Sequence, residues 1–451
     1  YHRTSLKNGS LHPRCLTLPS ALQTNGYVTG MMGKWHLAGD YQKDGGSRAV
    51  YPDQRGFDRF YGILGGASSF FAPFGLRRDR KLIDEEFIKN PDYYFTDAIG
   101  KEAIAFLETT PQDKPFFLYL PFTAAHWPLH APAREIEKYK SKFSAGWDKL
   151  RRERLKRMKE LGVIGSKVKL STRHANVSSW EDEKHKAWQE RRMEVYAAQV
   201  TIMDRVIGEV IDHLRKTGQL DDTLTFFTID NGGCHVEYGA DRKGDYLPEK
   251  TRDGRPMKPG NLTELMPGPE IPCQSYGSGW ANLSNPPYRL FKQYAHEGGI
   301  HTPFLARWPG KIKAGTDSVH LSAHWDILAT MADLTGQAAP KQSSGISMVP
   351  TLLGENADQK SHQHLYFEFL RGKSKTYTTR ALRMGDWKAV QRSKGNKGQE
   401  FLPIELYDLA SDIGETKDLA KKHPGQVRKM EKLMDEAHTP LPVKEKKISQ
   451  R

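Results

Sequence analysis

The chain has 451 residues, 37% of them hydrophobic, which is enough for one large α/β domain with a smaller domain beside it. It contains no uninterrupted run of about 18 apolar residues, so the sequence predicts no membrane-spanning helix, and its three cysteines exclude a disulfide-rich scaffold. The formal net charge of +14 favours anionic partners, whether nucleic acid, an acidic surface or a small anionic substrate.

Helices and strands alternate through the first three quarters of the chain. The predicted elements are, in order, a helix at 18–24, a strand at 27–35, a strand at 114–121, a highly charged and mostly helical segment at 135–192 with breaks at 162–165 and around 171–179, a helix at 193–217, a strand at 223–229, a strand at 302–308 and a helix at 325–336. One apolar stripe marks the helix at 193–217, and it consists of Val195, Ala198, Ile202, Val206, Val210 and Leu214. The stretch 241–288, rich in Gly, Pro, Asn and Ser, predicts a long surface loop.

The character of the chain changes after Gly354. Short strands are predicted at 366–370, 377–384, 387–391 and 404–409, and a final helix follows Pro424. The fold class is therefore α/β, with a mostly parallel central sheet flanked by helices and a smaller C-terminal antiparallel sheet with one covering helix. We expect residues 1–354 to form the larger α/β domain and residues 355–451 to form a small α+β subdomain.

Asp230 and Asn231 are candidate cation ligands. They begin the sequence Asp-Asn-Gly-Gly directly after a predicted buried strand, and ligands collect at the carboxyl ends of strands in open α/β sheets. Carboxylate and amide oxygens suit a hard cation such as Ca²⁺, but that ion takes about 6–8 oxygens, so further ligands must come from elsewhere. The alternative is an Asx turn, in which both side chains bond their own backbone.

Three further motifs supply cations and imidazoles. Lys34 and His36 are two residues apart at the end of a predicted strand and therefore point to the same side. His126 comes just past the strand at 114–121, and Lys292 precedes a Glu-Gly-Gly sequence whose glycines permit close backbone approach. Each motif alone is also compatible with a surface lysine or a packed histidine, and for Lys292 alone the surface lysine is the favoured interpretation.

Taken together, the four motifs predict one site for a tetrahedral oxyanion ester, because cations hold its oxygens while imidazoles move protons. The segments 134–192 and 241–288 are expected to shape the pocket for the rest of the substrate. Further candidates to line that pocket are His130, His235, His296 and His301. A nucleophile is lacking: no Gly-x-Ser-x-Gly elbow, P-loop or Rossmann glycine pattern occurs.

Motifs spread along the whole chain point to one family. They are GKWHL at 33–37, GFDRFYG at 56–62, AAHWP at 124–128, DNGG at 230–233, K-x₄-EGG at 292–299, RMGDWK at 383–388 and ELYDLASDIGET at 405–416. With these motifs, in this order, the chain resembles the sulfatase family of the alkaline-phosphatase-like superfamily, and most of all the bacterial arylsulfatases.

The resemblance implies hydrolysis of sulfate monoesters, aryl or carbohydrate, and gives each basic residue a role. Lys34 and Lys292 would bind the sulfate oxygens. His126 would contact the sulfate and, with Lys292, assist protonation of the leaving group. His36 would hydrogen-bond the nucleophile and act as base when sulfate is expelled.

The resemblance also implies one Ca²⁺ ion, with Asp230 and Asn231 among its ligands, and a formylglycine nucleophile made from Cys or Ser in a Cys/Ser-x-Pro-Ser/Thr-x-Arg context. Cys15 does not fit, because it reads Cys-Leu-Thr-Leu-Pro-Ser. We therefore expect the nucleophile, the remaining metal ligands and a central strand to lie upstream of this sequence. The fragment itself is then expected to be inactive and poorly stable, with hydrophobic strand edges exposed.

Two other functions compete with sulfate ester hydrolysis. One is a phosphomonoester or phosphonate hydrolase of the same superfamily, and the other is an inactive homologue that binds polyanions. The expected partners are a small anionic sulfate ester or sulfated saccharide and an enzyme that makes the formylglycine. No nucleic-acid-binding motif appears, so no nucleic acid is expected. The family implies a periplasmic or secreted protein.

Overall fold

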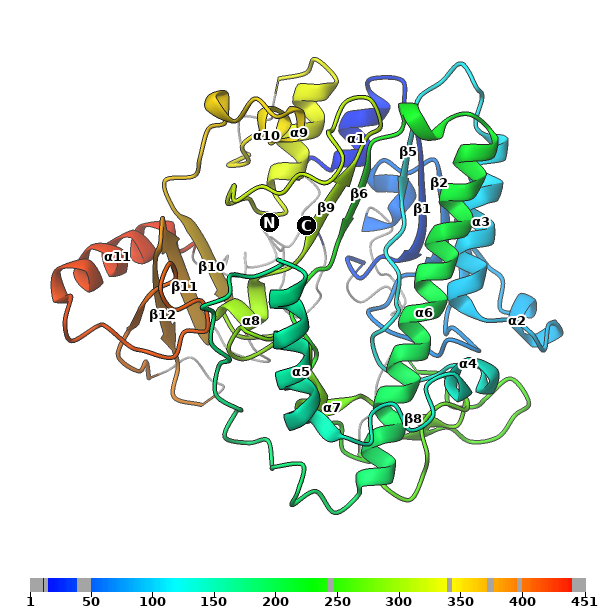
Figure 1. Ribbon diagram of the computed structural model, residues 1–451. Helices are drawn as coiled ribbons and strands as arrows, with labels where there is room; N and C mark the ends of the chain where they lie inside the picture. The colour runs from blue at the N-terminus through cyan, green and yellow to red at the C-terminus, as the bar shows by residue number, and fades with distance from the viewer. Residues whose placement is uncertain are drawn as a thin grey trace, which may run out of the picture.

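The computed structural model describes residues 11, 15–38, 50–241, 247–338, 343–370, 377–395 and 400–439. Within these residues the chain is an α/β protein with a helix-flanked central sheet and a separate antiparallel sheet near the C-terminus (Figure 1). The predicted fold class is confirmed. None of the helices in these ranges is long and apolar enough to cross a membrane.

The central sheet has five strands in the order β4-β3-β2-β1-β5. Its middle strand β1 (Val28–Lys34) pairs in parallel with β2 (Arg59–Ile63) on one side and β5 (Phe116–Tyr119) on the other. The short strands β3 (Arg77–Arg78) and β4 (Lys81–Leu82) extend the sheet in antiparallel fashion. The sheet is therefore mixed, and its parallel part is β2-β1-β5.

A second, two-stranded sheet lies next to the free edge of β5. It consists of β6 (Thr225–Thr228) and β9 (Phe304–Arg307), which pair antiparallel. Both strands were predicted, but their hydrogen bonds join them only to each other among the described strands. Figure 1 shows β6 and β5 side by side at the centre of the molecule.

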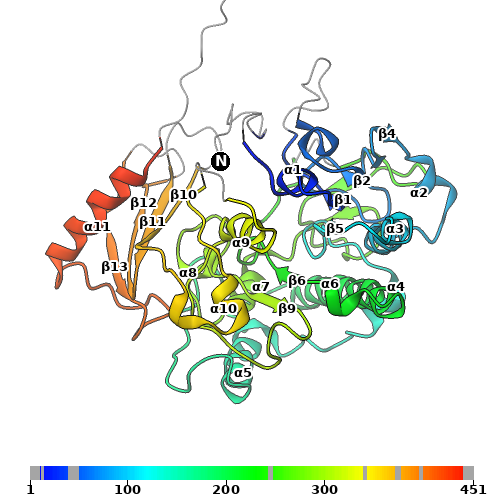
Figure 2. The same cartoon turned by 90° about the horizontal axis from the view of Figure 1, so that it is seen from above.

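Helices cover the strands on both sides (Figures 1 and 2). The long helix α6 (Lys186–Lys216) packs on α3 (Phe95–Thr109), and every residue of its predicted apolar stripe is buried. On the other side α1 (Leu18–Gln23) contacts β1 and α9 (Asp326–Leu334). The remaining helices before residue 360 are η2 (Pro52–Arg55), α2 (Glu85–Lys89), α4 (Ala133–Glu137), α5 (Gly146–Glu160), η3 (Leu220–Asp222), α7 (Gly277–Ser284), α8 (Glu297–Ile300), α10 (Val349–Leu353) and η4 (Asn356–Asp358).

Two sequence predictions need correction. The segment 135–192 is less helical than expected, because residues 161–185 contain no helix. The stretch 241–288 is a surface loop only in part. Residues 247–266 are mostly exposed or half-buried and contain the two-residue strand β7 (Lys258–Pro259), whereas residues 267–288 are mostly buried and contain β8 (Pro272–Cys273) and α7, with Trp280 fully buried. Side chains replace regular pairing there, since Gln274 donates hydrogen bonds to two backbone carbonyl oxygens of its own segment.

The C-terminal sheet has the order β10-β11-β12-β13, all antiparallel, as predicted. Its strands are β10 (Leu365–Phe369), β11 (Thr379–Met384), β12 (Trp387–Arg392) and β13 (Glu405–Asp408). Helix α11 (Pro424–Ala437) covers one face and buries Met430 and Met434 against it. The domain boundary at residue 354 stays a prediction.

Candidate functional site

Lys34 is the last residue of β1 and is held at the neighbouring strand's end. Its N–H donates to the carbonyl oxygen of Pro121, 2.9 Å away, just beyond β5. Gly33 precedes it with φ +140°, and a Cβ at Gly33 would clash with that same carbonyl oxygen. Glycine is therefore required for β1 to deliver the lysine at this close approach.

His36 follows in a left-handed backbone conformation, with φ 56°. Its N–H donates to the carbonyl oxygen of Leu64 at 3.1 Å, and its imidazole packs so closely over Gly66 that a Cβ there would clash with it. The residue is exposed. The turn lets Lys34 and His36 both line the space beyond the strand ends.

His126 and Lys292 are in direct contact. The Nδ1 of His126 lies 3.1 Å from the carbonyl oxygen of Trp127, so a proton on Nδ1 is donated there and Nε2 is left as an acceptor. The Nζ of Lys292 lies 3.4 Å from that Nε2 and donates to it. Two motifs that are 166 residues apart in sequence thus meet at one point.

Electrostatic interactions place the basic groups around one centre. The pKa of His126 is well below its ordinary value because the residue is buried and because Lys292 and Lys34 oppose a further positive charge. His36 has the same effect on His126, though a smaller one. Burial also lowers the pKa of Lys34, while Asp230 acts in the opposite direction. The structure therefore brings together the lysines and histidines that the sequence predicted.

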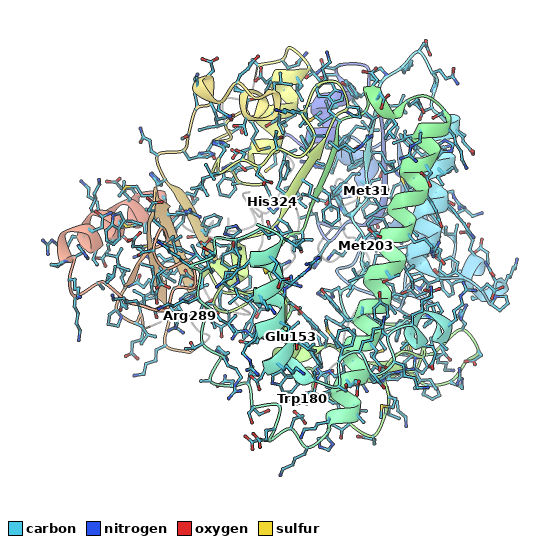
Figure 3. All side chains as sticks on the ribbon, viewed as in Figure 1. Met31, Glu153, Trp180, Met203, Arg289 and His324 are labelled. Atoms are coloured by element: carbon cyan, nitrogen blue, oxygen red, sulfur yellow. The ribbon has the colours of Figure 1, made fainter. Side chains whose placement is uncertain are left out.

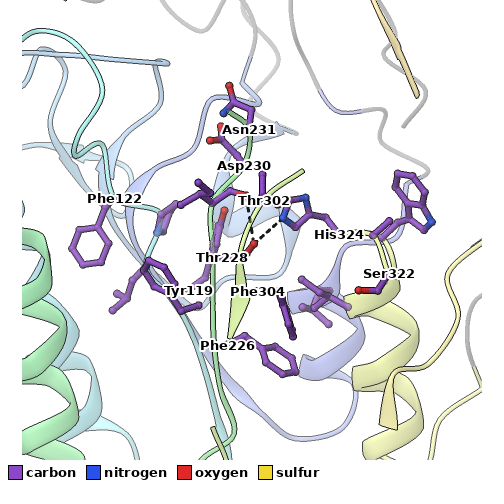
Figure 4. Close-up of a pocket in the computed structure, with 18 of the residues that line it drawn as sticks. Tyr119, Phe122, Phe226, Thr228, Asp230, Asn231, Thr302, Phe304, Ser322 and His324 are labelled. Atoms are coloured by element: carbon purple, nitrogen blue, oxygen red, sulfur yellow. Dashed lines mark hydrogen bonds between the residues drawn. The ribbon is translucent and has the colours of Figure 1, made fainter. Parts of the chain in front are cut away.

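Asp230 and Asn231 lie just beyond the end of β6 (Figure 4). The Oδ1 of Asn231 is buried and accepts no hydrogen bond from the described residues, which is not the arrangement of an Asx turn. An orphaned amide oxygen beside a carboxylate suits a hard cation. Within the described ranges, no three or more His, Cys, Asp and Glu residues group into a metal site.

The two loops that carry these residues are joined by backbone hydrogen bonds. The N–H of Lys292 donates to the oxygen of Gly233 at 3.1 Å, and the N–H of Gly232 donates to the oxygen of Gly299 at 3.1 Å. A Cβ at Gly232 would clash with the carbonyl of Gly298. The glycines of both motifs therefore serve close packing of one loop on the other.

A cavity of about 3250 Å³ extends from this site between β5 and β6 and reaches α6. Its walls are largely apolar and include Tyr119 and Ile229, which are 46% and 41% exposed. Met203 on α6 and His324 before α9 line it from opposite sides (Figure 3). The edges of β5 and β6 that face this space carry no paired strand among the described residues.

His324 is a site residue that the sequence analysis missed. Its Nε2 lies 3.1 Å from the Oγ1 of Thr228 (Figure 4). Burial lowers the pKa of His324, and the nearby charge of Asp230 acts against that shift. The only signal in the sequence was a histidine between the strand at 302–308 and the helix at 325–336.

The other histidines predicted to line the pocket lie in different environments. His130 is fully buried, 3.1 Å from the carbonyl oxygen of Pro272, and burial lowers its pKa to about 3. His296 is also fully buried, so neither residue lines the cavity. His301 does line it, while His235 stacks on Phe291 with ring centroids 4.6 Å apart.

Two family models match the sequence. The model described as Sulfatase matches residues 1–337, well over half of the chain. The model described as N-sulphoglucosamine sulphohydrolase, C-terminal, matches residues 288–441.

Similar proteins carry related names. An uncharacterized sulfatase of Schizosaccharomyces pombe is 32% identical over 445 residues, which cover 92% of this chain and 75% of that protein. The arylsulfatase of Klebsiella aerogenes is 30% identical over 337 residues, covering 72% of this chain and 69% of the enzyme. A protein solved in complex with its substrate D-glucosamine-2-N,6-O-disulfate superposes with a TM-score of 0.58 at 19% identity, covering 95% of this chain and 82% of its own, and so shares the fold.

Proposed function

The chain belongs to the sulfatase family, whose members hydrolyse sulfate esters, and from this premise we propose what each residue of its site does. The observation that carries the proposal is the convergence of Lys34, His36, His126 and Lys292 from three separate strand ends and loops. Two ammonium groups and two imidazoles around one point form a site for a compact anionic group such as a sulfate ester.

Lys34 and Lys292 bind the sulfate oxygens. Both side chains line the cavity, and the positive charge of each lowers the pKa of His126. They are close enough to each other that Lys292 also lowers the pKa of Lys34. The negative charge of the sulfate group relieves this repulsion, and charge-assisted hydrogen bonds then hold its oxygens. Charge that develops on these oxygens during reaction is stabilised by the same groups.

His126 and His36 move protons. The Nε2 of His126 already accepts a hydrogen bond from Lys292, so a proton can pass between this pair and the oxygen of the departing alcohol. The low pKa of His126 means that its imidazole is neutral before substrate arrives. His36, which is exposed, is the base that acts when sulfate is released.

Asp230 and the orphaned Oδ1 of Asn231 hold a Ca²⁺ ion together with ligands from outside the described residues. When bound, the ion withdraws charge from a sulfate oxygen. The chain's own contribution is to fix the two ligands, which it does through the hydrogen bond from Gly232 to Gly299.

The formylglycine of the family fits no cysteine of this sequence, because none of the three is followed two residues later by Pro. Our proposal is that the nucleophile, made by a maturation enzyme, comes from residues outside these 451 and enters beside Lys34 along the cavity between β5 and β6. The apolar walls of that cavity and its two unpaired strand edges support a strand as the entering element.

The substrate is a sulfated saccharide or a simple aryl sulfate. The arylsulfatase of Klebsiella aerogenes and the structure bound to D-glucosamine-2-N,6-O-disulfate support these two classes. The compartment, periplasmic or secreted, rests on the family alone.

The test is turnover by the protein expressed from its complete reading frame. We expect 4-nitrophenyl sulfate to be hydrolysed in preference to 4-nitrophenyl phosphate, with Ca²⁺ required. The His126→Asn variant should lose about 10²–10⁴-fold in kcat, whereas His185→Asn, at an exposed position, should not. Preferred turnover of the phosphate, or full sulfatase activity in His126→Asn, would overturn the proposal.

A further inference from the structure

A buried ion cluster joins the C-terminal sheet to the loop that carries Lys292. Lys388 of β12 is fully buried, with its Nζ 2.6 Å from Oε1 of Glu297 and 2.9 Å from Oε1 of Glu415. Both carboxylates are themselves at most 4% exposed. The sequence motifs RMGDWK and ELYDLASDIGET supply Lys388 and Glu415, and the site chemistry described so far uses neither motif.

The cluster contacts both ends of α8, the short helix after Lys292. Glu297 is its first residue, and the N–H of Glu297 donates to Oε2 of Glu415 at 2.8 Å. The other carboxylate oxygen of Glu297 lies 2.7 Å from Nδ1 of His301, which follows the helix. Burial alone would raise the pKa of Glu297, but Lys388 and His301 together bring it well below its usual range, so the carboxylate is charged.

A second contact holds the loop on the other side of Lys292. The Oε2 of Glu405 on β13 lies 3.2 Å from Nη1 of Arg289 and 3.1 Å from Nε2 of the buried His296. The carbonyl oxygen of Arg289 in turn accepts from the N–H of Gly298 at 2.9 Å. Residues on both sides of Lys292 are therefore tied to the C-terminal sheet by charged side chains.

Backbone hydrogen bonds connect the loop that carries Lys292 to the loop that carries Asp230 and Asn231. Gly299, within α8, accepts from the N–H of Gly232, and Lys292 donates to Gly233, each at 3.1 Å. Gly232 and Gly233 directly follow Asp230 and Asn231. Hydrogen bonds and the short backbone segments between them thus connect Lys388 to both the sulfate-binding lysine and the cation ligands.

The match to the C-terminal family model runs from residue 288 to 441 and so includes both the loop and the sheet, while the match to the Sulfatase model, residues 1–337, also includes the loop. A buried ion pair is a weak source of stability when compared with apolar packing of the same volume. Fixing the position of a functional loop gives such a costly cluster a role that apolar residues could not fill.

We propose that Lys388 and Glu415 are positioning residues of the sulfate site: the C-terminal sheet sets the place of Lys292 and, through Gly232, of Asp230 and Asn231. The proposal rests on the proposed function in one respect, that Lys292 binds sulfate. The role is that of a support, since neither residue lines the cavity.

The experiment compares the full chain with Lys388→Met, Lys388→Arg, Glu415→Gln and the matched control Lys394→Met, whose exposed lysine pairs with Glu400 at 3.3 Å. Two quantities are measured: the Kd for inorganic sulfate by calorimetry, and amide hydrogen exchange at Gly232, Gly298 and Gly299. We expect Lys388→Met and Glu415→Gln to weaken sulfate binding by about tenfold and to speed exchange at these glycines. Lys388→Arg should recover most of the affinity, because guanidinium also pairs with two carboxylates.

Wild-type affinity and wild-type glycine exchange in folded Lys388→Met would overturn the proposal, as would equal losses in Lys394→Met. If Lys388→Met does not fold, Glu415→Gln and Lys388→Arg carry the same comparison. If the wild-type chain binds no sulfate, the proposed function has failed, and glycine exchange alone still decides whether the cluster positions the loop.

Discussion

The backbone N–H of Lys292 donates a hydrogen bond to the carbonyl oxygen of Gly233 at 3.1 Å. This bond joins the loop with the sulfate-binding lysine to the loop with the cation ligands Asp230 and Asn231. An anion and a cation bound at this site would therefore share one backbone support, and a change in either loop should affect both ligands.

The first prediction concerns the contact between these loops. Gly232→Ala should weaken sulfate binding and lower the free energy of unfolding by about 1–3 kcal/mol, because its Cβ would clash with the carbonyl of Gly298. Gly208→Ala on α6 is the matched control: its Cβ meets nothing within 4 Å, and the helix should gain about 0.5–1 kcal/mol. Chemical denaturation measures both values, and equal stability of the two variants would refute the argument.

The second prediction concerns pH. The pKa of His126 is held below its ordinary value by burial, Lys292 and Lys34, and a bound dianion beside it should raise that pKa. Binding then takes up a proton, so sulfate affinity should increase as the pH falls from about 7.5 to about 5.5, since sulfate itself stays fully ionised.

Calorimetric titrations with sulfate across this pH range measure the slope of sulfate affinity against pH. In His126→Asn the slope should flatten, because the group that takes up the proton is gone. The same steep slope in wild type and variant would show that another group is responsible.

The third prediction concerns calcium. Two ligands from this chain make a weak site with Kd on the order of 1 mM, so 10 mM Ca²⁺ should stabilise the chain by about 1.4 kcal/mol. Asn231→Leu removes the orphaned Oδ1 and should abolish the effect. Thermal unfolding with and without Ca²⁺ measures the effect as a rise in the midpoint temperature Tm. An equal rise in Tm for the variant would show that the ion binds elsewhere.

The fourth prediction concerns the stability of the buried cluster. Lys388→Met should lower the free energy of unfolding by about 3–5 kcal/mol, because two buried carboxylates lose their common cation. Lys394→Met, from an exposed pair, should change it by less than about 1 kcal/mol. Urea denaturation distinguishes them, and a similar small change in both would mean that Glu297 and Glu415 are neutral.

Sequence patterns were sufficient where one element has one periodic face. The stripe from Val195 to Leu214 predicted α6 and its buried side, and the four short strands after Gly354 were found in order. That Lys34, His126 and Asp230 lie near one another could be predicted, because polar groups gather beyond the ends of strands in α/β proteins, here β1, β5 and β6. Their roles stay predictions.

Other features carry no periodic signal. The second half of the stretch 241–288 is buried through individual contacts, such as the indole N–H of Trp188 donating to Gln274 at 2.9 Å, so its composition suggested a loop. His324 depends on a fold that brings it next to Thr228, 96 residues away. Lys388 looked like any strand lysine, because its partners Glu297 and Glu415 come from distant segments.

The most direct test of the central claim is a calorimetric titration of the full chain with inorganic sulfate, repeated with Lys34→Met and Lys292→Met. The account predicts one bound sulfate per chain and an affinity loss of about 10–100-fold in each variant, as expected for losing a charge-assisted hydrogen bond. Sulfate binding that is unchanged in both variants, or no binding at millimolar sulfate, would contradict the assignment of these lysines to the sulfate.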